Sequence, residues 1–150
     1  GCMRGGGARY LMEVAGPRSY VATDRHEEYV DACRKRGPAP PGLRYEHAEE
    51  TALAGLADAG SFDYILCVES TAPIKDWPGF LQGCWHLLRP GGRLMFCDFM
   101  TRGKYQTITR GLHESGFVID AEIDLGRAVN AVGIASVPKS CSFMRIVAVK

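Results

Sequence analysis

Hydrophobic and polar positions alternate along the chain in two ways. Two segments, "FDYILCVE" (62–69) and "GRLMFCDF" (92–99), are almost continuously apolar. Such runs are typical of strands that are buried on both faces of a parallel sheet. Shorter β-rich segments predict four further strands, over 19–24, 43–47, 117–125 and 142–150.

Between these strands the apolar residues recur with helical spacing. The predicted helices cover 6–15, 26–36, about 49–58, 77–88 and 104–115. "RPGG" (89–92) is typical of a helix end, because proline and glycine interrupt the helix and allow the chain to reverse. Strands and helices that alternate at this spacing predict an α/β fold with a doubly wound sheet, formed by one domain over residues 1–150.

The chain opens on the glycine-rich turn "GCMRGGG", directly before the first predicted helix. A turn of this kind lets a ligand approach the backbone closely. Asp24 ends the strand 19–24, about twenty residues further on, where an acid can accept hydrogen bonds from both hydroxyls of a ribose. Together they predict a nucleoside ligand. Two alternatives stay open: the turn only needs positive φ angles, or Asp24 caps the helix 26–36.

A central strand normally leads into such a glycine turn, and no strand precedes Gly1 in this sequence. We therefore expect an N-terminally truncated fragment whose first, central strand is missing. Its neighbouring strands would each lack a ladder partner, so the 150 residues alone are expected to be marginally stable and prone to aggregate.

Two families combine a glycine turn with a following acid. The turn and "YVATDR" are similar to short-chain dehydrogenases, but their proton relay needs a Tyr-x-x-x-Lys pair that is absent here. "FDYILCVES" followed by "DWPGFLQGCWHLLRPGGRLMFCDF" resembles the fourth strand, next helix and fifth strand of class I S-adenosylmethionine-dependent methyltransferases. The resemblance is strongest to the small-molecule branch. It implies a Rossmann-like sheet with an antiparallel last strand, and it places the missing strand between those ending at Asp24 and Glu69.

The resemblance also implies the residues that bind S-adenosylmethionine. "GCMRGG" is similar to the family's G-C-G-x-G-G turn, and "HAEETAL" is similar to the segment whose acid meets the adenine amino group. Glu49 takes the place of that acid, with Glu50 as the neighbouring possibility. The resulting cofactor-binding set is Gly1, Met3, Gly5, Asp24, Arg25, Glu49 and Glu69.

Methyl transfer to a small-molecule acceptor is the expected reaction, by in-line displacement at an activated sulfonium carbon. The protein then mainly aligns and desolvates the reactants. Where a base is needed, Glu69 and Asp98 are the candidates, since both end central strands. The alternative is a catalytically silent module that binds a nucleoside or a partner, because Met3 replaces the turn's middle glycine and Ala72 and Pro73 replace a histidine pair.

Composition adds few restrictions. The net charge is +1 with both signs interspersed, which predicts neither nucleic acid nor a membrane surface as a partner. Six cysteines show no metal-ligand spacing, so we expect reduced thiols, no metal and a cytoplasmic location. The methyl acceptor and the oligomeric state are not predicted. Residues 126–141 join the last two strands, in a region that can approach the substrate in similar proteins.

Overall fold

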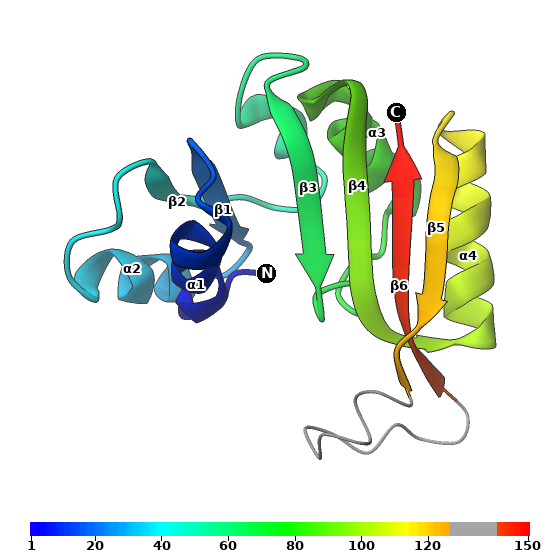
Figure 1. Cartoon of the computed structure of the whole chain (residues 1–150), viewed down its shortest axis with the longest axis horizontal. Coiled ribbons are helices and arrows are strands. Elements are labelled where there is room, and N and C mark those ends of the chain that lie inside the picture. Colours follow the sequence, from blue (N-terminus) through cyan, green and yellow to red (C-terminus); the bar gives the residue numbers. More distant parts are fainter. Residues whose placement is uncertain (127–140) are drawn as a thin grey trace. The chain divides into compact units, whose positions relative to one another are not determined.

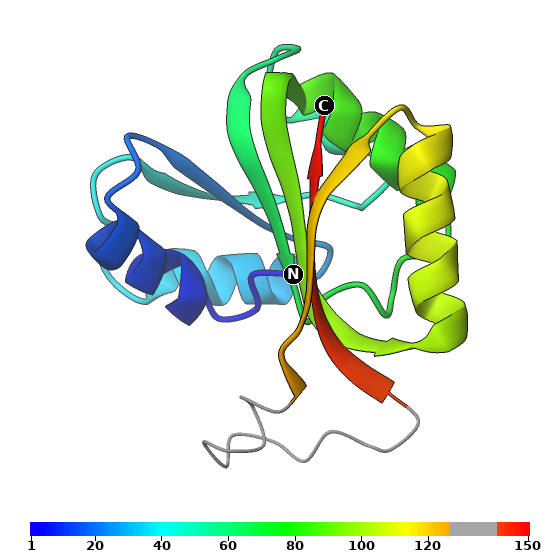
Figure 2. The same cartoon turned by 45° about the vertical axis from the view of Figure 1, so that its right-hand side comes forward.

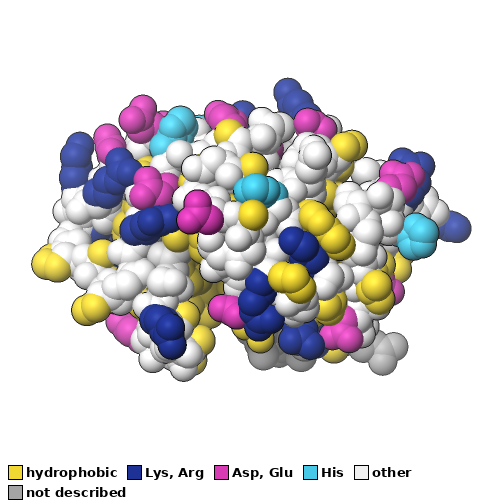
Figure 3. Space-filling view, turned by 90° about the horizontal axis from the view of Figure 1, so that it is seen from above, with side chains coloured by type: hydrophobic (Ala, Val, Ile, Leu, Met, Phe, Trp, Pro, Cys, Tyr) yellow, Lys and Arg dark blue, Asp and Glu magenta, His cyan; other side chains and the backbone are white. Residues whose placement is uncertain are grey.

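The computed structural model describes residues 1–126 and 141–150, and these divide into two compact units, Gly1–Glu49 and Glu50–Lys150. The predicted substrate-facing segment 126–141 lies almost entirely outside the described residues. None of the described helices is long and apolar enough to cross a membrane. On the face shown in Figure 3, acidic and basic side chains are interspersed, in keeping with the low net charge.

The N-terminal unit is a two-stranded parallel sheet with two helices (Figure 1). Its elements are α1 (Gly6–Ala15), β1 (Tyr20–Asp24), α2 (Glu27–Lys35) and β2 (Leu43–His47). Apolar side chains from all four elements form one small core: Ala8, Ala22, Val30, Cys33, Leu43 and Tyr45. Parallel register sets Asp24 beside His47, so the carboxyl ends of both strands lie at one edge.

The C-terminal unit is a four-stranded mixed sheet in the order β3-β4-β6-β5. Its elements are η1 (Leu53–Gly55), β3 (Phe62–Val68), α3 (Trp77–Leu87), β4 (Leu88–Thr101), α4 (Arg102–Glu114), β5 (Val118–Asp124) and β6 (Cys141–Val149). β3 and β4 are parallel, and the last strand, β6, is antiparallel to both of its neighbours, as expected.

Helices α3 and α4 lie on one face of this sheet (Figures 1 and 2). The alternation of β4 explains the packing, because Leu94, Phe96, Asp98 and Met100 are buried while the residues between them are more exposed. Phe96 meets the rings of Trp77 and Phe80 on α3, with centroids 6.0 and 6.3 Å away. Trp77 therefore packs between its own helix, α3, and β4.

Two expectations about local structure were wrong. The segment 49–58 forms only the 3-10 turn Leu53–Gly55, of which Leu53 alone is buried, so no helical face is available for packing. "RPGG" does end α3, but its residues belong to the start of β4 rather than to a separate reversal. The ladder with β3 is irregular there, between Phe62 and Tyr64.

β1 and β3 each lie at the edge of their own sheet. Among the described strands, β1 pairs with β2 alone and β3 pairs with β4 alone. The two strands expected to flank a central strand therefore do not share one ladder. The α/β architecture and the mixed sheet of the C-terminal unit agree with the predicted Rossmann-like class.

Candidate functional site

The glycine turn is held by the carboxylate of Asp24. Its Oδ2 accepts the Met3 amide at 2.8 Å and its Oδ1 accepts the His26 amide at 3.0 Å. The side chain is almost fully buried, at 4% exposure. Asp24 is not the N-cap of α2, because His26 occupies that position and makes no capping hydrogen bond with its side chain. The helix-cap alternative is therefore wrong, and Asp24 ties the turn to the end of β1.

Further contacts fix the backbone of the turn on both sides. The amide of Cys2 and the N-terminal amino group of Gly1 donate to the carbonyl of Thr23, at 2.8 and 2.9 Å, so the turn continues along the end of β1. The Cys33 thiol lies 3.1 Å from the Met3 carbonyl, which it can reach as a donor. The turn is thus positioned before any ligand arrives, which lowers the entropic cost of binding.

Gly5 is required by geometry. Its φ is +74°, and an added Cβ would lie 2.7 Å from the Tyr45 hydroxyl oxygen and 2.9 Å from Cys33 Sγ. Gly5 therefore supports the alternative that the turn needs a positive φ angle. It does not argue against a ligand at the turn, because both can hold at once. Met3 also adopts a positive φ of 46°, with its side chain 60% exposed, so it does not fill the turn. Non-glycine residues pay roughly 1–2 kcal/mol for that conformation.

The thiols of Cys2 and of Cys33 on α2 both lie near the Met3 carbonyl, at 4.0 and 3.1 Å. Burial first, and the neighbouring Cys33 second, raise the pKa of Cys2 to about 12. All six cysteines are free thiols. A thiol that stays protonated at neutral pH is a poor nucleophile, so this pair serves the packing of the turn.

Glu49 is exposed just beyond β2, at the edge where Asp24 ends β1. The Ala48 amide donates to the Asp24 carbonyl at 3.0 Å, which holds the chain beside β1 directly before Glu49. Arg25 is exposed, and its carbonyl lies 2.9 Å from His47 Nε2. The predicted cofactor residues of the N-terminal unit are therefore brought together at one edge of its sheet.

The residues fit a nucleoside in one specific respect. An ionised carboxylate has about four acceptor sites, and the two amides use two of those on Asp24. Glu49 adds a second, exposed carboxylate at the same edge. Among residues 1–126 and 141–150, no three His, Cys, Asp or Glu side chains are grouped to hold a metal ion.

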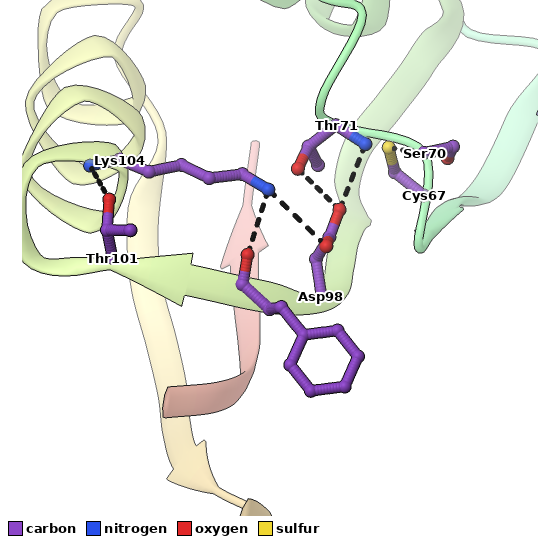
Figure 4. A network of polar contacts seen from close by, with 7 residues as sticks. Cys67, Ser70, Thr71, Asp98, Thr101 and Lys104 are labelled. Carbon is purple, nitrogen blue, oxygen red and sulfur yellow. Dashed lines mark hydrogen bonds and ion pairs between the residues drawn. The ribbon is translucent and has the colours of Figure 1, made fainter. Parts of the chain in front are cut away.

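Asp98 lies in a polar network in the C-terminal unit (Figure 4). Its Oδ2 accepts the amide of Thr71 at 3.0 Å and the Thr71 hydroxyl at 2.5 Å. Its Oδ1 lies 3.3 Å from Lys104 Nζ, which also donates to the Phe99 carbonyl at 2.9 Å. Asp98 is buried, at 6% exposure. Its contacts connect the loop after β3 to β4 and to the start of α4.

Glu69 differs from Asp98 in each of these respects. It is exposed and follows the last residue of β3, and its amide donates to the Cys97 carbonyl at 2.9 Å. Its φ of 47° is unusual for a residue other than glycine. Sparsely populated backbone conformations of this kind cluster at functional sites.

Sequence reasoning missed Thr71 and Lys104, although both contact a predicted residue. The available signal was the burial expected at Asp98, because a buried carboxylate needs donors close by. Asp76 caps α3, since its carboxylate accepts the Gly79 amide at 3.0 Å. His86 and His113 are exposed.

The family model of the methyltransferase domain matches residues 1–96, well over half of the chain. The chain therefore belongs to the methyltransferase domain family. It is 33% identical over 103 residues to a phthiotriol/phenolphthiotriol dimycocerosates methyltransferase of Mycobacterium leprae, covering 69% of this chain and 37% of that protein. A fatty-acid O-methyltransferase of Mycolicibacterium smegmatis is 32% identical over 102 residues, covering 68% and 36%. The chain thus spans little more than a third of these relatives' length.

Solved structures share the fold. A geranyl diphosphate C-methyltransferase from Streptomyces coelicolor A3(2) superposes with a TM-score of 0.81 at 15% identity, over 99% of this chain and 70% of that one. An S-adenosylmethionine-dependent methyltransferase from Mesorhizobium loti gives 0.77 at 18% identity, over 100% and 88%. These likenesses support the Rossmann-like class predicted from the sequence.

Proposed function

We propose that the protein transfers a methyl group from S-adenosylmethionine to a small-molecule acceptor by in-line displacement. The observation that carries this is the glycine turn anchored on Asp24, with Glu49 at the same strand edge, in a chain of the methyltransferase domain family. S-adenosylmethionine, when bound, supplies a methyl group on an already activated sulfonium. Matching relatives act on lipids by name, which favours an apolar acceptor.

In this proposal the residues at the strand ends bind the cofactor. Gly1, Met3 and Gly5 present turn backbone, Asp24 offers its remaining acceptor sites to the ribose, and Glu49 accepts the adenine amino group. Arg25 and Glu69 complete the proposed cofactor set. A cytoplasmic location also remains part of the proposal.

For the acceptor, Glu69 is the better base of the two candidates. A general base must present a free lone pair to the proton it removes, and a base contributes about 10²–10⁴-fold in rate. Asp98 is 6% exposed and three of its about four acceptor sites are engaged by Thr71 and Lys104, whereas Glu69 is exposed. We therefore assign Asp98 a lesser part, in holding the loop that carries Glu69, while its direct role as a base stays a prediction.

The test is a calorimetric titration of S-adenosylmethionine and, separately, NADPH. Binding of the first and not of the second is expected. Glu49→Gln should weaken S-adenosylmethionine binding about tenfold, since a charge-assisted hydrogen bond contributes roughly 1.5–3 kcal/mol. Glu50→Gln is the matched control and should leave the affinity within twofold. Equal effects of both variants would contradict the adenine assignment.

The same titration separates the catalytically silent alternative, which Met3 in the turn favours. Such a module binds the nucleoside but transfers no methyl group. Binding of S-adenosylmethionine without release of S-adenosylhomocysteine, in the presence of lipid acceptors, would select that alternative over the enzyme.

A further inference from the structure

A buried polar network in the C-terminal unit connects α4 to the loop after β3. Among the described residues, three polar or charged side chains are buried, and two of them, Thr71 and Asp98, contact each other. Figure 4 shows Thr71 and Lys104 approaching the Asp98 carboxylate from opposite sides. A buried carboxylate is costly unless donors surround it, so its partners decide whether this loop keeps its shape.

The network fixes the backbone around Glu69. The Glu69 amide donates to the Cys97 carbonyl at 2.9 Å. Thr71, two residues after Glu69, donates both its amide and its hydroxyl to the same oxygen of Asp98. The backbone is therefore held at Glu69 itself and again at Thr71, whereas the side chain of Glu69 is exposed.

Glu69 has a backbone conformation that needs such support. Its φ is +47°, in the left-handed region that residues with a Cβ disfavour. The strain is comparable to the net worth of one ordinary hydrogen bond, whereas Thr71 makes two hydrogen bonds to a charged group, each of which is stronger. The contacts of Thr71 therefore outweigh the tendency of Glu69 to relax.

Lys104 provides the charge opposite Asp98. Its Nζ lies 3.3 Å from Asp98 Oδ1, the oxygen that Thr71 does not contact, and donates to the Phe99 carbonyl at 2.9 Å. The amide of Lys104 donates to the Thr101 hydroxyl at 3.2 Å, so the start of α4 sets its position. Without Lys104, Asp98 would be buried without this opposite charge, and its hold on Thr71 would weaken as it turned toward water.

We infer that Lys104 is a positioning residue for Glu69 and acts through Asp98 and Thr71. Lys104 holds the Asp98 carboxylate, Asp98 holds Thr71, and Thr71 keeps the loop in the shape that presents the Glu69 carboxylate. The inference rests on the proposed function, in which Glu69 takes the proton of the acceptor as the methyl group leaves sulfur and bonds to the deprotonated atom. Lys104 touches neither reactant in this scheme.

The first test measures the strain at Glu69 with and without Lys104. In the unaltered protein, Glu69→Gly should favour folding about fivefold over Glu69→Ala, because glycine reaches positive φ freely. Alanine removes the same carboxylate and is therefore the matched reference. In a Lys104→Met background the loop relaxes, so we expect the advantage of glycine over alanine to fall to less than about twofold. Urea unfolding followed by circular dichroism gives each folding constant.

Lys75→Met is the control background, since Lys75 is exposed further along the same loop. It should leave the advantage of glycine unchanged, and Lys104→Arg should keep most of it because arginine retains the charge. If Lys104→Met fails to fold, Lys104→Gln replaces it with the same expectation. An advantage of glycine that persists undiminished without Lys104, or that is absent from the unaltered protein, overturns the inference.

Turnover distinguishes positioning from stability alone. The probe is dodecanol, whose hydroxyl must lose its proton, and release of S-adenosylhomocysteine is measured. Lys104→Met should lower kcat about tenfold, a part of what a base contributes, and leave KM for S-adenosylmethionine within about twofold. In a Glu69→Gln background, Lys104→Met should have no further effect on kcat, because the group that it positions is gone. An equal loss in both backgrounds would overturn the inference.

A parallel calorimetric titration with S-adenosylmethionine keeps the two proposals apart. Absence of cofactor binding or of turnover, alongside a strain at Glu69 that depends on Lys104, would count against the proposed function alone. Cofactor binding and turnover with a strain that is indifferent to Lys104 would refute the inference alone.

Discussion

Replacing Asp24 by alanine is expected to lower both the stability and the cofactor affinity of the protein. The carboxylate accepts the amides of Met3 and His26, at 2.8 and 3.0 Å, and is almost fully buried. Alanine leaves both donors without a partner. Each costs about 1–3 kcal/mol when buried, and water reaches part of the turn, so we expect a total loss of about 2–4 kcal/mol.

Asp24→Asn is expected to destabilise the protein less than Asp24→Ala. The amide side chain keeps one oxygen that can accept a backbone donor, but its NH₂ group faces the other donor. About half of the alanine effect is expected, roughly 1–2 kcal/mol. Asp31→Ala is the matched control, because Asp31 lies on α2 in the same unit and makes only an exposed contact of 3.6 Å with Arg34. That pair should contribute less than about 0.5 kcal/mol.

The assay is urea unfolding followed by circular dichroism, with S-adenosylmethionine calorimetry on the folded variants. If the free energy of unfolding of Asp24→Ala lies within about 0.5 kcal/mol of that of the unaltered protein, the anchoring role is refuted. Loss of a buried acceptor of two amides should lower that free energy by more. A large loss of stability with unchanged affinity would instead refute the ribose contact. Loss of affinity alone would mean that the carboxylate serves the ligand and not the turn.

Three further results are expected. Met3→Gly should raise the free energy of unfolding by up to about 1 kcal/mol, because φ is positive there, whereas Met3→Ala should not; urea melts decide. The raised pKa of Cys2 means that the turn is most stable below pH 9 and loses stability as pH rises toward 12; melts at pH 7 and 10 that coincide would contradict this. Thr71→Val should cost about 1–3 kcal/mol by removing a donor to Asp98, and Thr71→Ser should restore it; equal melts of the two would refute the bond.

Most of the fold was predictable because its signals are local. Almost continuous apolar runs identified β3 and β4, and the helical spacing over 6–15 agrees with α1 residue for residue. The segment 49–58 shows where such signals fail. Its alanines and leucines favour a helix, but Gly55 interrupts it and only Leu53 is buried in the core. Packing, which local propensity does not contain, decided against the helix.

The placement of the candidate residues near strand ends was predictable from the sequence, whereas their hydrogen-bond partners were not. Strand ends in an α/β sheet carry ligand-binding residues, so Asp24, Asp98 and Glu69 could be chosen from position alone. The contact between Thr71 and Asp98 depends on the path of the loop after β3, and no local pattern encodes that path.

The four candidate acids divide into two kinds, Asp98 lying within β4 and the others at or after strand ends, and their burial explains the division. Asp24 and Asp98 are buried, and each accepts a backbone amide from a neighbouring loop, because a carboxylate leaves water only where donors replace it. Glu49 and Glu69 are exposed, on longer side chains that follow β2 and β3. The short, buried acids therefore set the shape of the loops, with Asp24 proposed to meet the ribose as well, and the exposed glutamates present their carboxylates at the surface. A search for catalytic groups in this chain should begin with the glutamates, since removing an aspartate also removes the loop that it holds.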